Sequence, residues 1–120
     1  MEYNLVHKNN LSYLECLPGI LCIRNEADAI DWVALCGENE TDKLMIYADN
    51  LSEDFFHLST RVAGEILLKF SIYQIKIAAV LTPELVNQGK FQEWVLETNR
   101  GNDFRVFYTR EKAEAWLVGL

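Results

Sequence analysis

Residues Gln74–Leu81, which read QIKIAAVL, decide the fold of this chain. The run from Ile77 to Leu81 is apolar without interruption. Continuous rather than alternating apolarity indicates a strand that is covered on both faces. Lys43–Ala48 (KLMIYA) and Phe104–Tyr108 (FRVFY) show similar patterns. We therefore predict three buried strands, which are typical of a mainly parallel sheet with helices packed against it.

Segments with helical periodicity separate these strands. Apolar residues recur at helical spacing within residues 27–36, 62–70, 91–96 and 113–120. Asn25 and Thr109 are suitable N-caps, and Gly37 is placed to end the first helix in the left-handed conformation. Gly64 interrupts the second helix, and we expect it to allow close approach to the sheet.

The N-terminal residues predict a β-hairpin. Tyr3–Lys8 and Leu11–Cys16 flank Asn9-Asn10, and asparagine tolerates the left-handed backbone of a two-residue hairpin turn. The strands and helices that follow alternate, which implies crossover connections. We therefore predict an α/β fold with one domain over residues 1–120. Its sheet is mixed and mostly parallel, with an N-terminal hairpin and about four helices.

Composition and charge limit the possible functions. The chain has 120 residues, of which 50% are hydrophobic and 24% charged, as in one globular domain. Its net charge of −7 argues against nucleic-acid binding, which requires a basic face. No apolar run is long enough to span a bilayer and no segment resembles a signal peptide. We expect a cytoplasmic protein without membrane contact. The acidic excess lies in residues 1–60. We favour solubility as its explanation, and a basic partner is the alternative.

The sequence lacks the common motifs for nucleotide, zinc and serine-hydrolase chemistry. The three cysteines, Cys16, Cys22 and Cys36, have no CxxC spacing, and we expect free thiols. His7 and His57 are the only histidines, too few for a typical zinc site. We expect no metal and no cofactor, and we favour a function other than catalysis while leaving an enzyme open.

Two segments carry positive indications of binding. Ser59, Thr60 and Arg61 stand where a helix begins after a buried strand. Hydroxyl groups at such a position cap backbone N–H groups, and they can also bind an anion or accept a phosphate. Asn99 and Arg100 stand where another helix ends beside the sheet. For both segments we favour ordinary capping and surface ion pairs as the explanation, with binding as the alternative.

Two stretches resemble a known family. They are Asn50–Phe70, with SEDFF at 52–56 and AGEIL at 63–67, and Glu97–Gly101, ETNRG. Together they resemble the small bacterial proteins of domain-of-unknown-function family 4180, over roughly residues 25–117. The resemblance implies a glycine where Arg61 stands.

The order of elements in that family is similar to the STAS domain of anti-sigma-factor antagonists, an α/β sandwich with a mixed sheet. This resemblance implies a regulatory domain that binds a protein and is switched by phosphorylation near the start of its second helix. Ser59 and Thr60 occupy about that place. The surrounding residues do not match the Asp-Ser-Ser-Gly pattern of the antagonists.

Our first hypothesis is a non-enzymatic STAS-like domain that binds a protein partner or a second copy of itself. The contact would lie where the second helix begins and in the adjacent loop with Phe55 and Phe56. If these aromatic side chains are exposed they mark the contact, and if they are buried they belong to the core.

The alternative hypothesis is a sensor or enzyme that binds a small molecule or an anion. Open α/β sheets place ligands at the C-terminal ends of their parallel strands. Asp49, Ser59, Thr60 and Arg100 are the candidate contributors to such a pocket.

Overall fold

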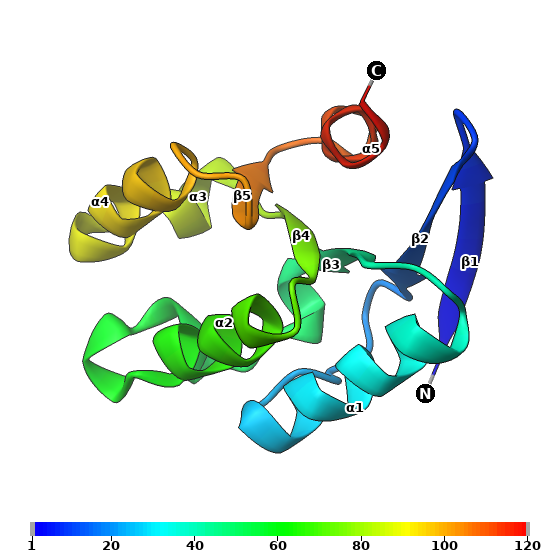
Figure 1. The fold of residues 1–120 in the computed structure, drawn as a ribbon. Coiled ribbons are helices and arrows are strands. Elements are labelled where there is room, and N and C mark those ends of the chain that lie inside the picture. The colour runs from blue at the N-terminus through cyan, green and yellow to red at the C-terminus, as the bar shows by residue number, and fades with distance from the viewer. Residues whose placement is uncertain (1, 120) are drawn as a thin grey trace.

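The computed structural model describes residues 2–119 and contains a five-stranded sheet with helices on both faces (Figure 1). The strand order is β1-β2-β3-β4-β5, in which β1 pairs antiparallel with β2 and the other pairs are parallel. The strands are β1 (Tyr3–Lys8), β2 (Leu11–Cys16), β3 (Lys43–Tyr47), β4 (Lys76–Val80) and β5 (Phe104–Phe107). The helices are α1 (Glu26–Glu38), α2 (Val62–Ile72), α3 (Pro83–Val86), α4 (Gly89–Thr98) and α5 (Arg110–Val118). The predicted α/β fold with a mixed sheet and an N-terminal hairpin is confirmed.

The hairpin forms as predicted. Asn9 and Asn10 both adopt left-handed backbone angles, with φ of 54° and 62°, as a two-residue turn with right-handed strand twist requires. The side chain of Asn9 donates a hydrogen bond to the carbonyl of Val118 at 2.8 Å. The turn is thereby tied to the end of α5.

The larger core lies between the sheet and α1, α2 and α4. Trp32 of α1, Ile66 of α2 and Val95 of α4 are buried against one face, which presents Leu44 and Ile46 of β3. From β2 to β5 the chain adds each strand next to the previous one. The strand order therefore does not reverse among these four strands, and reversal is what creates the ligand crevice of doubly wound folds.

The opposite face of the sheet carries α5 (Figure 1). Met45 of β3 and Ala78 of β4 are buried there beneath Ala113 and Leu117. The central strands are thus covered on both faces, as their continuous apolar sequences predict.

The prediction that Gly37 ends α1 in a left-handed conformation is wrong. The helix continues to Glu38, and the positive φ of 56° occurs at Glu40. The side chain of Asn39 donates to the carbonyl of Leu35 at 2.8 Å, and its backbone N–H donates to the same oxygen. This polar cap satisfies the last turn without a left-handed glycine.

Candidate functional site

The residues predicted to bind a ligand or partner lie at opposite ends of the sheet. Asp49, Ser59 and Thr60 follow β3, at the C-terminal ends of the parallel strands. Asn99 and Arg100 lie between α4 and β5, at the N-terminal ends. The structure therefore does not bring Arg100 together with the other three residues of the predicted pocket.

Asp49 lines an open depression at the C-terminal ends of the strands. Ser52 and Leu85 line it as well. The hydroxyl oxygen of Ser52 is buried and, within residues 2–119, forms no hydrogen bond. Neither Ser59 nor Thr60 contributes to this depression.

Asn99 has a structural role at the edge of the sheet. Its Oδ1 accepts a hydrogen bond from the backbone N–H of Val106 at 2.8 Å, and its Nδ2 donates to the Val106 carbonyl at 3.4 Å. The side chain thereby covers part of the free edge of β5. The neighbouring Arg100 is 79% exposed and pairs with Glu97 at 3.6 Å.

Phe55 belongs to the core. It is fully buried, and its ring lies 5.9 Å from Trp94 and 6.4 Å from Phe104. Phe56 is half-buried and packs edge-on against Phe55 and Phe91, with centroid distances of 5.6 Å and 5.4 Å. These contacts hold the segment between β3 and α2 against α4.

The hydroxyl groups at the start of α2 differ in their contacts. Thr60 Oγ1 donates to the carbonyl of Asp54 at 2.7 Å and accepts from the N–H of Val62 at 3.3 Å. Arg61 is the N-cap residue of α2, and the Thr60 hydroxyl lies just before it and accepts from the first N–H of the helix. Ser59 and Thr60 are both exposed. Arg61 has a φ of 67°, a conformation that glycine adopts without strain, so a glycine suits this position.

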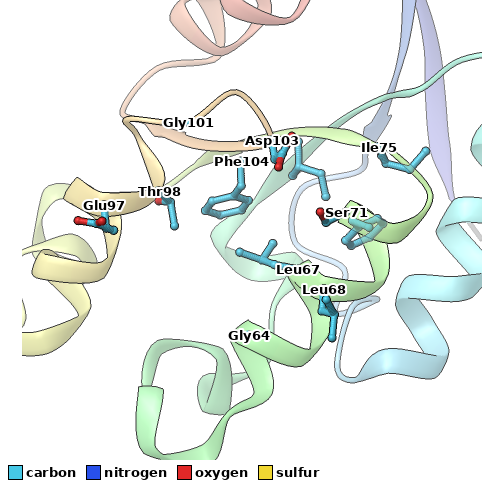
Figure 2. A pocket seen from close by; sticks show the side chains of 12 residues that line it. Gly64, Leu67, Leu68, Ser71, Ile75, Glu97, Thr98, Gly101, Asp103 and Phe104 are labelled. Carbon is cyan, nitrogen blue, oxygen red and sulfur yellow. The ribbon is translucent and has the colours of Figure 1, made fainter.

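An apolar groove between α2 and α4 is the main feature that the sequence did not predict (Figure 2). Its volume is about 380 Å³. The buried side chains of Ile77 and Phe104, from β4 and β5, form its floor. Figure 2 shows Leu67 of α2 and Thr98 of α4 on opposite sides of the groove, with Phe104 between them.

The groove exists because α2 carries two apolar stripes rather than one. Its first stripe is buried against the sheet and consists of Ala63, Ile66 and Phe70. Its second stripe faces the groove and consists of Gly64, Leu67, Leu68 and Ser71. The second stripe keeps helical spacing, but Leu68 remains 59% exposed.

Gly64 does not allow a close approach to the sheet, so that prediction is wrong. A Cβ atom at this position would meet no atom within 4 Å. The residue is exposed and lines the groove. Its small size keeps the groove open instead.

The charged residues that line the groove are Glu97 and Asp103. Glu97 is 76% exposed and pairs only loosely with Arg100. The carbonyl of Asp103 accepts a hydrogen bond from the N–H of Ile77 at 2.8 Å, which fixes the backbone of Asp103 beside the floor. Among the described residues that line the groove, none is basic. The rim is therefore acidic.

The groove also joins the two stretches that carry the family resemblance. Gly64 and Leu67 belong to AGEIL at 63–67, and Glu97, Thr98 and Gly101 belong to ETNRG at 97–101. The two stretches form its opposite walls.

The α5 face holds a polar cluster instead of a groove. Arg110 Nε donates to Glu15 Oε2 at 2.8 Å, and the Tyr47 hydroxyl donates to the same carboxylate. Burial acts to raise the pKa of Glu15, but the hydrogen bonds from Arg110 and Tyr47 and the charge of Arg110 outweigh it. The pKa of Glu15 is therefore below its ordinary value, and its carboxylate is ionised at neutral pH.

Glu114 extends this polar cluster. Lys8 Nζ lies 2.8 Å from its carboxylate, and the Tyr13 hydroxyl donates to the same group. These two partners hold the pKa of Glu114 below its ordinary value. Burial, together with the bond to Glu114, raises the pKa of Tyr13. Side chains of the polar cluster satisfy one another and fix α5 to β1 and β2.

The three cysteines are free thiols, as predicted. Burial raises the pKa of Cys16, and burial raises the pKa of Cys36 to about 12. A hydrogen bond from Cys16 lowers the pKa of the half-buried Cys22. Within residues 2–119, no three His, Cys, Asp or Glu side chains are grouped so as to hold a metal ion.

The sequence profile of a family described as "Domain of unknown function (DUF4180)" matches residues 8–117. The chain belongs to this family. The match includes β2 to β5 of the DUF4180 sheet but only the last residue of β1, Lys8, and it includes both walls of the groove. Comparisons with curated proteins and with solved structures give no match. Across the described part of the chain, the helices are too short or too polar to cross a membrane.

Proposed function

We propose that this DUF4180 chain is a cytoplasmic, STAS-like regulatory domain that acts by binding another protein rather than by catalysis. The observation that carries the proposal is the open apolar groove between α2 and α4. An apolar surface of this kind is costly to leave in water and marks a contact site in soluble proteins.

The apolar surface extends beyond the groove itself. Leu68, which lines the groove, is followed one turn later on α2 by Ile72, and each is 59% exposed. Tyr73, which follows the helix, is 55% exposed. A small molecule seated over Ile77 and Phe104 would leave Ile72 and Tyr73 in water. A protein surface would cover them together with the groove, so a protein partner accounts for more of the exposed apolar area.

The regulatory part of the proposal rests on Ser59. Its hydroxyl is exposed, whereas the Thr60 hydroxyl is engaged with the backbone of Asp54 and Val62. A phosphate on Ser59 would add negative charge where α2 begins, which would weaken the binding of an acidic partner and favour that of a basic one. Ser59→Asp, compared with Ser59→Ala, tests whether that charge changes partner binding.

Paired leucine variants test the contact surface. Leu68 lines the groove, and Leu96 on α4 does not, yet their exposed fractions are 59% and 60%. The wild-type chain and the variants Leu68→Glu and Leu96→Glu are immobilised, and proteins retained from an extract of the source organism are identified by mass spectrometry. We expect the wild-type chain and Leu96→Glu to retain one defined partner in equal amounts. Leu68→Glu should retain about tenfold less of it, which corresponds to the free energy of burying one leucine side chain.

Both variants alter exposed side chains, so their urea midpoints should stay close to that of the wild type. Equal retention by Leu68→Glu and Leu96→Glu would show that α2 and the groove are not the contact surface. The proposal also fails if no protein is retained by the wild-type chain above the level of an unrelated acidic domain.

A further inference from the structure

We propose that the occupant of the groove is a basic amphipathic segment of the partner protein. An apolar side chain of this segment enters the groove, and its flanking lysine or arginine side chains pair with Glu97 and Asp103. This inference rests on the proposed function and adds the chemistry of the partner to it.

The groove combines an apolar floor with an acidic rim. Ile77 and Phe104 are buried and offer only carbon to an occupant. Glu97 and Asp103, by contrast, are exposed carboxylates at the edge of the groove. An occupant therefore needs an apolar centre and positive charge on its margin. Rim charges of this kind guide the encounter and the choice of partner more than they raise affinity.

The cations near the groove have other partners. Arg105 donates to the carbonyl of Gly101 at 2.7 Å and to Asn102 Oδ1 at 3.1 Å, and not to a carboxylate of the rim. Arg100 pairs with Glu97 at 3.6 Å, but both side chains are more than three-quarters exposed, and such a pair is worth little in water. Lys69 of α2 pairs with Glu26 of α1, on the side of α2 away from α4. None of these three cations pairs with Asp103, which forms no ion pair within residues 2–119.

The groove is less suited to a second copy of the chain or to a small ligand. A second copy of the chain also carries a net charge of −7 and would bring like charge to an acidic rim. A small ligand would be poorly enclosed, because Gly64, Leu68 and Ser71 leave one wall of the groove open to solvent. Ligand sites commonly bury most of the ligand surface, whereas helix-in-groove binding needs only one face.

Synthetic peptides test the charge of the occupant directly. The probe is an amphipathic peptide of about 14 residues built from leucine and lysine at helical spacing. A leucine–glutamate peptide of the same pattern and a scrambled leucine–lysine peptide are the controls. We expect the leucine–lysine peptide to bind the wild-type chain at least about tenfold more tightly than either control, with an affinity that falls as salt is raised.

Two pairs of variants locate the binding. Gly64→Trp fills the groove, whereas Gly37→Trp places the same side chain on α1; an added Cβ meets no atom within 4 Å at either helical glycine. Gly64→Trp should abolish binding and Gly37→Trp should retain it. Glu97→Gln with Asp103→Asn should weaken binding by about tenfold. The control pair, Glu38→Gln with Glu111→Gln, removes the same amount of charge away from the groove and should not weaken binding.

Several results would overturn the inference. The first is that the leucine–glutamate peptide binds as tightly as the leucine–lysine peptide. The second is that the two double variants that remove carboxylates lose equal amounts of binding. The third is that Gly64→Trp still binds the peptide. Sedimentation that shows a wild-type dimer dispersed by Leu68→Glu would assign the groove to a second copy. If Leu68→Glu loses its cellular partner but the basic peptide does not bind, the proposed function stands and only the basic chemistry of the partner is wrong.

Discussion

The two faces of the sheet use their side chains in opposite ways. On the α5 face, the carboxylates of Glu15 and Glu114 are nearly buried and are matched by Arg110, Lys8 and tyrosine hydroxyls. On the α2–α4 face, the aliphatic side chains of the groove are left partly uncovered, and its carboxylates remain in water.

This difference separates stability from binding. Charges that are already matched within the fold have little left to offer a ligand, and breaking them is costly. Apolar side chains that are left in water gain free energy when another molecule covers them. The charged and tyrosine side chains of the polar cluster therefore hold α5 in place, and the leucines of α2 form the candidate contact.

Phe55→Ala gives the largest expected effect on stability. Phe55 is fully buried, and its ring contacts Phe56, Phe91, Trp94 and Phe104. Removing it leaves a cavity where α2 and α4 meet the sheet, and we expect a loss of about 3–5 kcal/mol in the free energy of unfolding. Urea unfolding followed by tryptophan fluorescence measures the loss. A change below about 1 kcal/mol would mean that Phe55 is not a core residue.

Arg110→Met gives the next largest effect. It leaves the buried carboxylate of Glu15 with the Tyr47 hydroxyl but without its cation. Because Arg110 is itself 40% exposed, water screens the pair, and we expect about 2 kcal/mol rather than the larger loss of a fully buried pair.

Arg100→Met is the matched control for Arg110→Met. Arg100 and Glu97 are 79% and 76% exposed, so the variant should change the free energy of unfolding by less than about 0.5 kcal/mol. Equal losses from the two arginine variants, measured by urea unfolding, would contradict the contrast between the two faces.

Local signals explain which parts of the fold could be predicted from the sequence. The bounds of β1 and β2 follow from the two-residue turn at Asn9-Asn10 and the strand segments on either side of it, all within one short segment. The central strands follow from continuous apolar runs. Thr109 caps α5 as predicted, with its hydroxyl 3.2 Å from the N–H of Lys112.

The candidate site depends on distances between segments, which a single sequence does not contain. Helical periodicity identified Leu67 as apolar, but not whether a neighbouring helix covers it. The pairing of Glu15 with Arg110 joins residues 95 positions apart. The separation of Arg100 from Ser59 is predictable from topology alone. In a sheet with parallel crossovers, the connection before β5 and the connection after β3 lie at opposite ends of the sheet. Arg100 lies in the first connection and Ser59 in the second.

The pH dependence of stability gives the sharpest test of the α5 face. The pKa values of Glu15 and Glu114 lie below their ordinary value of 4.5 in the folded chain. The unfolded chain therefore binds protons first as the pH falls. The stability that Glu15 and Glu114 contribute is fully present above the pKa that they have in the unfolded chain. It is lost as the pH falls through their lower pKa values in the folded chain.

Urea midpoints measured from neutral pH down to about pH 3 follow this loss. Glu15→Gln removes one of the two carboxylates, so its midpoint should fall less steeply in acid than that of the wild type, even though it starts lower at neutral pH. Arg110→Met should flatten the curve as well, because Glu15 loses the partner that contributes most to its lowered pKa. An unchanged acid slope in both variants would mean that the polar cluster does not hold Glu15 as a carboxylate, and the contrast with the groove would lose its electrostatic basis.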